Sequence, residues 1–265
     1  MKNKTTFLSI LAVMGFSMIL LLASCSKKQS GEEEWIQLFN GKDLSGWTPK
    51  FTGYPAGENY NNTFRVEDGI LKASYENWDS FDNVFGHLIT EDTFSHYKLH
   101  VEYRLTGDQV SGGPGWARKN NGLMLHSQSA KSMNEDQDFP VSLEVQLLSG
   151  LGEGPRPTAN LCTPGTNVVM DGELITQHCN QSSSKTYGEE WVNVDVIVKG
   201  SEILHHIVDG DTVMTYTKPQ IGGGNLPEGY PLEEGTLVES GHIAIQAESH
   251  PTEFREISLM KLSKD

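Results

Sequence analysis

The sequence is poor in cysteine and in basic residues, and it contains only one long apolar run. Three cysteines in 265 residues exclude a fold that depends on many disulfides. Lysine and arginine number 20 against 35 aspartates and glutamates, so the formal net charge is −15. Such an excess of negative charge repels phosphate groups, and no basic stripe with interleaved aromatic residues occurs. We therefore expect no nucleic-acid partner.

The apolar run spans residues 7–23 and follows the basic residues Lys2 and Lys4. This arrangement predicts a secretory signal segment. The run ends in small residues directly before Cys25, a pattern that resembles the processing site of bacterial lipoproteins. An uncleaved membrane anchor and a soluble secretory signal are the alternatives, but neither requires a cysteine at this position. We therefore expect cleavage before Cys25.

Three parts follow from this interpretation. Residues 1–24 are a lipoprotein signal peptide, residues 25–34 are the lipidated Cys25 with a polar tether, and residues 35–265 form one domain. Acyl chains on Cys25, palmitate among them, are sufficient for stable anchoring. We expect a protein of the cell envelope, held to the outer membrane on its periplasmic or surface face.

The two remaining cysteines, Cys162 and Cys179, are separated by a segment rich in glycine, proline and asparagine. In an oxidising compartment such a pair predicts a disulfide that closes a loop. Two free thiols are one alternative. A metal site that uses His178 and Cys179 is another, but neighbouring side chains rarely bind one metal without a further spaced ligand.

The rest of the sequence is typical of an all-β domain. Several segments alternate apolar and polar residues with a period of two, and no window has an apolar face of helical period. The predicted strands are residues 97–104, 122–126, 142–147, 191–198, 203–208, 241–247 and 254–262. Many short strands separated by turns predict a β-sandwich or jelly roll of two antiparallel sheets.

The same alternation sorts the polar side chains onto faces. Glu144 and Gln146 lie opposite the apolar residues of their strand, and Glu102 lies with Arg104 in the same way. The polar faces carry histidine, glutamate, glutamine, asparagine and arginine but few lysines or threonines. Solvated outer faces of a sandwich are the plain interpretation. A cleft for carbohydrate is the alternative, because sugar hydroxyls need many donors and acceptors.

Seven motifs in order resemble one family, the 3-keto-disaccharide hydrolase domain. The opening motif is Leu-Phe-Asn-Gly-Lys-Asp-Leu-Ser-Gly-Trp at residues 38–47, and the others are residues 64–71, 97–104, 120–126, 142–148, 191–200 with 208–210, and 241–262. The resemblance implies a concanavalin A-like jelly roll, common in exported proteins, and cleavage of 3-keto-glycosides. Three positions depart from the commonest pattern of the family. These are Asn121 for serine, His126 for arginine and Glu256 for asparagine.

Cleavage of a 3-keto-glycoside by elimination needs a base, a stabiliser for an enolate oxygen and an acid for the leaving group. His126 and Glu144 have the residue types for base and acid, and we predict them to be catalytic. The stabiliser could be Arg104, Gln146 or a bound divalent cation. The predicted substrate-binding residues are Glu102, Arg104, Trp116, Asn120, Gln146, Gln246 and Glu248.

Three alternatives remain open from the sequence. A direct hydrolase would use two carboxylates from among Glu102, Glu144 and Glu248. A glycosidase or lyase could act on unoxidised glycans. A non-catalytic lipoprotein could bind glycans for uptake.

Some further residues bear on ligands. Trp47, Trp78 and Trp116 are candidate platforms for stacking a sugar, with Trp116 favoured because it lies in a glycine-rich loop. The acidic segment 134–138 brings oxygen ligands together but lacks the spacing of a calcium hand. The geometric expectation is that His126, Glu144 and Gln146 converge in one cleft, with Glu248 near its rim.

Replacing the lipidated cysteine tests the predicted anchor. Cys25→Ser removes the only thiol that can be acylated at the processing site, so the variant is expected to leave the membrane fraction or to remain unprocessed. Partition between detergent and aqueous phases measures this. A variant that is cleaved before position 25 and still partitions with detergent would contradict the prediction.

Overall fold

The computed structural model describes residues 34–264, with residue 225 excepted. The apolar run and Cys25 lie outside the described residues, so the predicted signal peptide and lipid anchor stay predictions. Within the described part, no helix is long and apolar enough to cross a membrane. These described residues form one compact unit.

The larger sheet has ten strands, all in antiparallel pairs. Its order is β11 (Glu173–Ile175), β10 (Thr166–Met170), β15 (Asp211–Ile221), β14 (Ile203–Val208), β13 (Val192–Lys199), β6 (His96–Leu105), β17 (Thr252–Lys261), β4 (Ile70–Ala73) and β3 (Phe64–Glu67), and β1 (Trp35–Gln37) pairs with β17. Strand β6 has the clearest alternation, since every second residue from Tyr97 to Leu105 is buried.

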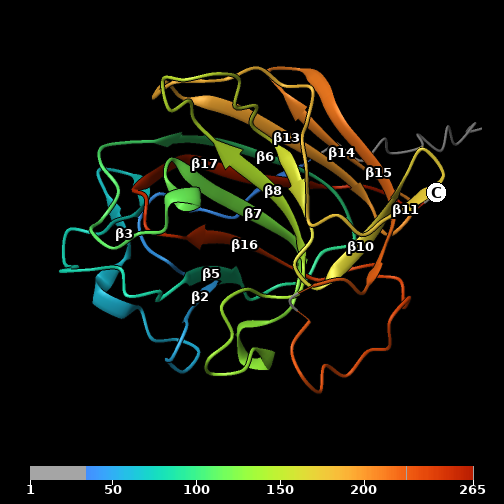
Figure 1. The fold of residues 1–265 in the computed structure, drawn as a ribbon, viewed down its shortest axis with the longest axis horizontal. Coiled ribbons are helices and arrows are strands. Elements are labelled where there is room, and N and C mark those ends of the chain that lie inside the picture. Colours follow the sequence, from blue (N-terminus) through green and yellow to red (C-terminus); the bar gives the residue numbers. More distant parts are fainter. Residues whose placement is uncertain (1–33, 225, 265) are drawn as a thin grey trace, which may run out of the picture. The chain divides into compact units, whose positions relative to one another are not determined.

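The smaller sheet has seven antiparallel strands. Its order is β12 (Cys179–Asn180), β9 (Asn160–Cys162), β8 (Leu143–Leu148), β7 (Asn120–Ser127), β16 (His242–Ala247), β5 (Gly86–Thr90) and β2 (Trp47–Phe51). Three short 3₁₀ turns, η1 (Tyr60–Asn62), η2 (Gly115–Ala117) and η3 (Ala130–Ser132), are the helical elements of the described residues. Figure 1 shows β8, β7, β16 and β5 side by side in one layer, with β17, β6 and β13 in the other. The predicted all-β sandwich of two antiparallel sheets is confirmed.

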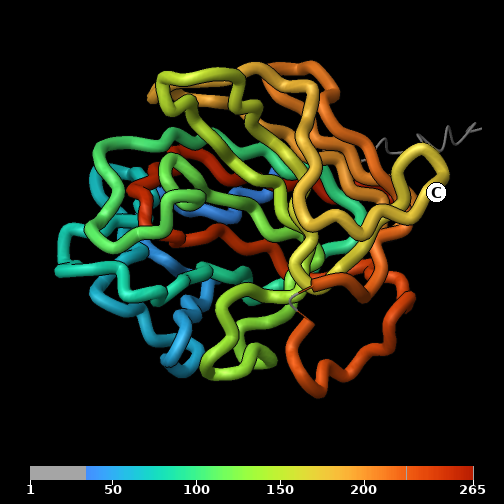
Figure 2. Tube along the Cα trace, viewed as in Figure 1, coloured from blue at the N-terminus to red at the C-terminus, as the bar shows by residue number. Residues whose placement is uncertain are grey.

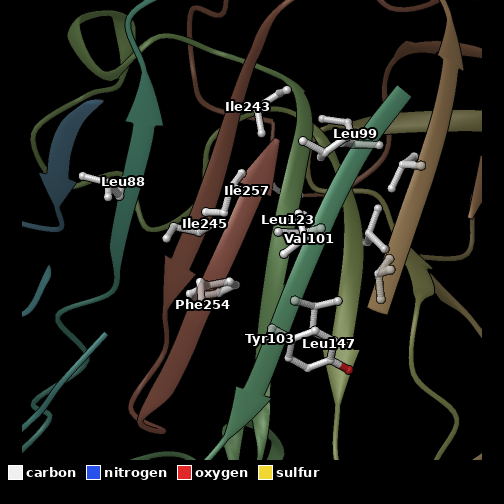
Figure 3. Packing of buried hydrophobic residues seen from close by; sticks show 14 of the residues in the cluster. Leu88, Leu99, Val101, Tyr103, Leu123, Leu147, Ile243, Ile245, Phe254 and Ile257 are labelled. Atoms are coloured by element: carbon white, nitrogen blue, oxygen red, sulfur yellow. The ribbon is translucent and has the colours of Figure 1, made fainter. Parts of the chain in front are cut away.

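The core lies between the two sheets. Leu123 and Leu147 of the smaller sheet face Val101 and Tyr103 of β6, and Phe254 of β17 adds an aromatic ring (Figure 3). All five side chains are inaccessible to solvent. Since full burial of a large apolar side chain contributes about 1.5–3 kcal/mol, this interface dominates the stability of the fold.

The smaller sheet is buried on both faces, which a simple sandwich does not require. Strands β5 and β7 have no residue that is more than slightly exposed. A second apolar cluster covers part of the outer face, and its members are Ile89, Met124, Ala130, Met133 and Ala244. Ala130 and Met133 belong to the loop between β7 and β8, so this loop forms a lid over the sheet.

The long loop from β15 to β16 is the orange segment at the lower right of Figure 2.

The structure joins Cys162 to Cys179 in a disulfide, as the sequence predicted, with the two residues facing each other in the pairing of β9 with β12. Strand β12 has only two residues and lies at the edge of the smaller sheet. A strand this short gains little from backbone pairing, so the disulfide adds a covalent attachment to the hydrogen bonds that its flanking residues make.

Removing the disulfide tests this attachment. The cysteines are 17 positions apart, and a loop of about this length implies a loss of about 3 kcal/mol in the free energy of unfolding for Cys162→Ala with Cys179→Ala. Urea unfolding of the double variant measures the loss. A free energy equal to that of the wild type would show that β12 is held by other contacts.

Candidate functional site

A cavity of about 360 Å³ lies on the outer face of the smaller sheet. Its lining residues are Trp116, Asn120, Phe139, Glu144, Gln146, Cys162, Pro164, His178, Cys179 and Glu248. Five of the residues predicted from the sequence to act in catalysis or binding are therefore together in one place. They come from strands β7 and β8, the end of β16 and the loop before β7.

Strand pairing explains why these polar side chains meet. Gln146 pairs with Gly122 across the β7–β8 ladder, and Glu144 lies two residues before Gln146 on the same face. Gly122 has no side chain, and a Cβ atom there would lie 2.5 Å from Glu144 Oε1 and 2.5 Å from Gln246 Oε1. The glycine thus lets side chains from both neighbouring strands fold over it.

Glu248 enters from the other side, just beyond the end of β16. Its side chain is buried, as is that of Asn120 on the neighbouring strand β7. The next residue, Ser249, has a φ of 94°, which is strained for a residue other than glycine. Its backbone N–H donates to the Tyr75 hydroxyl at 2.7 Å, and its carbonyl accepts from Val110 N at 3.0 Å. These bonds stabilise the turn that directs Glu248 into the cavity.

Glu144 and Glu248 form a buried carboxyl pair without a counter-charge. Neither accepts a hydrogen bond from a described residue, and no lysine or arginine lines the cavity. Burial raises the pKa of Glu144 to about 8. Burial, followed by the repulsion of Glu144, raises the pKa of Glu248 well above its ordinary value. The pair therefore keeps at least one proton at neutral pH.

An aromatic wall forms one side of the cavity. Trp116 is 55% exposed and stacks on Phe85 at a centroid distance of 5.9 Å, and Phe85 contacts Phe139 at 5.0 Å. The Trp116 loop is tied to the carboxyl pair, because Gln109 Nε2 donates to the Pro114 carbonyl and to the Ser249 hydroxyl. An exposed indole on a fixed loop is a suitable surface for stacking a sugar ring.

The disulfide forms the opposite side. Cys162 pairs with Glu144 on β8 and with Cys179 on β12, so the cystine lies beside the carboxyl pair. The carbonyl of His178 accepts from Thr163 N at 2.8 Å and from Thr163 Oγ1 at 3.2 Å. His178 is thereby fixed at the rim of the cavity.

Several buried polar atoms around the pair have no hydrogen-bond partner among the described residues. They are Asn120 Oδ1, both polar atoms of the Gln246 amide, Glu248 Oε2 and His87 Nε2. Gln246 pairs with His87 on β5, directly beside Gly122. Buried polar groups are seldom left unpaired in folded proteins, so this cluster indicates a place built to receive a polar ligand.

The prediction that His126 shares this cleft is wrong. A bulge in the β7–β16 pairing and a φ of 48° at His126 reverse the direction of its side chain. The imidazole contacts the Gly200 carbonyl at 3.1 Å and packs edge-on against Tyr97, so it lies between the two sheets. Burial lowers the pKa of His126 to about 4. A neutral imidazole in the core is a structural group, and strict alternation failed because a bulge shifts the period.

The predicted binding roles of Glu102 and Arg104 are also contradicted. Both lie on β6 of the larger sheet, on its outer face, away from the cavity. Arg104 Nε donates to Glu253 at 2.7 Å, and Glu102 is paired with Arg255. Both guanidinium groups stack on the Trp191 ring, at 4.6 and 4.7 Å. This is a partly exposed ionic cluster on the opposite side of the sandwich.

Two predicted tryptophan platforms belong to the core instead. Trp47 donates to the Leu38 carbonyl at 2.7 Å and Trp78 donates to Thr63 Oγ1 at 2.9 Å, and both are buried. The acidic segment 134–138 lies in the lid loop. Buried Lys50 donates to the Glu135 carbonyl at 2.9 Å, which holds the loop beside β2.

Sequence analysis missed His178, Phe139 and Pro164 as lining residues. His178 was considered only as a metal ligand, although its place beside a disulfide cysteine was a usable signal. Phe139 and Pro164 lie in loops, where no period indicates the direction of a side chain. His87 was not singled out because residues 86–90 were not among the predicted strands.

Solved structures of similar fold come from carbohydrate-related and unassigned proteins. Two candidate glycosyl hydrolases from Parabacteroides distasonis are each 17% identical, with TM-scores of 0.54 and 0.52. The alignments cover 87% and 86% of this chain and 95% and 100% of those chains. A Bacillus subtilis protein of unknown function with a galectin-like fold is 11% identical, with a TM-score of 0.52, over 86% of this chain and 94% of that one. At these identities the likeness establishes the fold alone.

No curated protein matches the sequence significantly. A family model described as the 3-keto-alpha-glucoside-1,2-lyase-like domain matches residues 34–260. That match spans both sheets and every strand that lines the cavity. The chain therefore belongs to the 3-keto-disaccharide hydrolase family of carbohydrate-active proteins, the 3-keto-alpha-glucoside-1,2-lyase-like domains.

Proposed function

We propose that the protein cleaves the glycosidic bond of 3-keto-glycosides by elimination in the cavity of the smaller sheet. The observation that carries this proposal is the buried carboxyl pair Glu144–Glu248, which lies without a counter-charge beside the exposed ring of Trp116. A cavity of about 360 Å³ accommodates a disaccharide-sized ligand. The family match supports a sugar substrate, and the orphaned amides of the floor suit sugar hydroxyls.

During the reaction negative charge develops on the 3-carbonyl oxygen. The carboxyl pair is the proposed group that stabilises this charge. A protonated carboxyl that burial keeps neutral can donate a hydrogen bond to an enolate oxygen. The raised pKa of Glu144 gives it this property at neutral pH. This role replaces the acid role that the sequence predicted for Glu144.

His178 is the proposed base, in place of His126, because it is the histidine that lines the cavity. The imidazole takes the proton from the carbon next to the carbonyl, and the C–H electrons form the enolate. The enolate then collapses, the carbonyl reforms and a double bond forms between C1 and C2. The glycosidic C–O bond breaks, and the leaving oxygen takes back the proton from the imidazole. The products are an unsaturated 3-keto sugar and a free alcohol.

We also propose that this chemistry takes place in the cell envelope, with the protein anchored by lipid on Cys25. The N-terminal pattern and the disulfide support this location, since disulfides persist in oxidising compartments. A glycan-binding protein without turnover is the main competing function, and kinetics of site variants distinguish the two.

Glu144→Gln is expected to abolish most turnover of a 3-keto-disaccharide while keeping substrate binding. Loss of one electrophilic group in a buried site lowers kcat by about 10²–10³. The measurement compares kcat with the substrate dissociation constant, for the full-length protein in detergent, on the 3-keto and unoxidised forms of one disaccharide. Glu102→Gln, on the outer face of the larger sheet, is the matched control and is expected to retain wild-type turnover.

Three results would contradict the proposal. Full activity of Glu144→Gln would remove the carboxyl pair from the mechanism. Equal turnover of the unoxidised sugar would point to an ordinary glycosidase. Binding of the sugar without any turnover by the wild type would favour the glycan-binding function.

The carboxyl pair also predicts a dependence of stability on pH. Between about pH 4.5 and about pH 8 the folded protein holds protons that the unfolded chain has released, because burial raises the pKa of both groups. The pair therefore makes the free energy of unfolding fall as pH rises through this window. Glu144→Gln removes the contribution of Glu144 and its repulsion of Glu248, so the variant gains stability relative to the wild type as pH rises. Urea unfolding across this pH range, without divalent cations, measures the difference, and parallel curves would contradict the prediction.

A further inference from the structure

We propose that Asn120, Glu144, Gln246 and Glu248 form a binding site for a divalent cation of the calcium class. The site shares the cavity of the proposed function, but binding of the cation does not depend on the sugar reaction.

The four residues surround one point of the sheet, the glycine of β7. Asn120 lies two residues before Gly122 and therefore on the same face. Glu144 Oε1 and Gln246 Oε1 both lie over Gly122, each 2.5 Å from the position that its Cβ would take. Glu248 is two residues after Gln246 and lines the cavity with Asn120. Three adjacent strands thus direct side-chain oxygens to a common centre.

The atoms at this centre have the character of cation ligands. Asn120 Oδ1, Gln246 Oε1 and Glu248 Oε2 are buried acceptors without a hydrogen-bond partner among the described residues. Asn120 is 2% exposed and Gln246 is fully buried, so bulk water does not solvate them. Carboxylate and amide oxygens are the ligands that calcium takes, at six to eight positions that waters or sugar hydroxyls can complete.

Charge gives the second argument. Two carboxyls are buried together, and among the described residues no lysine or arginine lines the cavity. The other titratable groups around the pair are His178 at the rim, His87 beside Gln246 on β5, His250 after β16 and Tyr75, whose hydroxyl lies near Glu248 and accepts from Ser249 N. Burying an ionised carboxylate without a partner is costly, so the pair must hold either protons or a cation. A divalent cation neutralises both charges at once.

The acidic segment 134–138 is a poorer cation site than the cavity. Glu135, Asp136 and Asp138 are exposed, and the Glu135 carbonyl already accepts from Lys50 and from Gly53 N. No side chain of this segment is among the buried unpartnered groups of the described residues. The most acidic segment of the sequence, residues 134–138, is therefore not the place where buried, unpartnered cation ligands come together.

A cation at this centre would serve the proposed reaction. It would bring positive charge to the carbonyl oxygen of a bound 3-keto sugar. When no cation is bound, the proton of the carboxyl pair has this role. Protons and the cation compete for Glu144 and Glu248, so affinity is expected to increase as pH rises.

Calorimetric titration of CaCl2 into the chelator-stripped full-length protein in detergent, without sugar, tests the inference. We expect one site with a Kd of about 0.1–1 mM near pH 8 and weaker binding near pH 5. Glu144→Gln and Glu248→Gln are each expected to weaken binding at least about tenfold, because each removes a charged ligand. Asp136→Asn, in the exposed acidic segment, is the matched control and is expected to bind calcium as the wild type does.

Gly122→Ala gives a second, independent variant. Its added methyl group displaces the ends of Glu144 and Gln246 without changing any ligand, and we expect it to weaken calcium binding at least about tenfold. Absence of calcium binding by the wild type at millimolar concentration would overturn the inference. So would wild-type affinity in both Glu144→Gln and Gly122→Ala, or loss of binding only in Asp136→Asn. Calcium binding without turnover of a 3-keto sugar would instead leave this site in place and reject the proposed reaction.

Discussion

Burial of both faces of the smaller sheet is the constraint on which the site depends. One face packs against the larger sheet through apolar side chains, and the lid loop covers part of the other through Ala130 and Met133. Polar groups on that second face are consequently removed from water without being neutralised. Glu144, Glu248 and Gln246 owe their unusual state to this desolvation, since the same side chains on an open sheet would be solvated and ordinary.

The walls of the cavity are held by contacts between segments that are distant in sequence. Lys50 of β2 fixes the lid loop through the Glu135 carbonyl, and Gln109 ties the Trp116 loop to Ser249. The Cys162–Cys179 disulfide attaches the short strand that positions His178. Three covalent or hydrogen-bonded connections therefore stabilise rim segments that have little regular structure of their own. Such support is what keeps a binding site in one geometry before the ligand arrives.

The fold by itself does not decide the function, because structures of similar fold include candidate hydrolases and a galectin-like protein of unknown function. The distinguishing feature is the chemistry at the centre of the cavity. A buried carboxyl pair without a counter-charge is unfavourable for stability, so its presence indicates a functional role. The proposed reaction places positive charge beside a carbonyl oxygen, and the carboxyl pair suits this role, whether a proton or a cation supplies the charge.

The sequence by itself determined the all-β class, the family and five of the ten residues that line the cavity. Alternation placed Glu144 and Gln146 opposite the apolar core residues of β8, because one buried face fixes the orientation of a whole strand. The motifs of the family fixed the order of the strands along the chain. The pair of cysteines identified the disulfide, since few other partners were available.

Only the tertiary structure decided which polar faces meet. Glu102 and Arg104 follow the same alternation as Glu144, yet their strand belongs to the other sheet, and strand order is set by pairings between distant segments. His126 was misplaced because one bulge turns its side chain into the core, and no local pattern reports a bulge. His178 and Phe139 joined the site through loops whose path depends on a disulfide and a buried lysine. Periodicity determines how a side chain points within its own strand, whereas the packing of strands and loops determines what it faces.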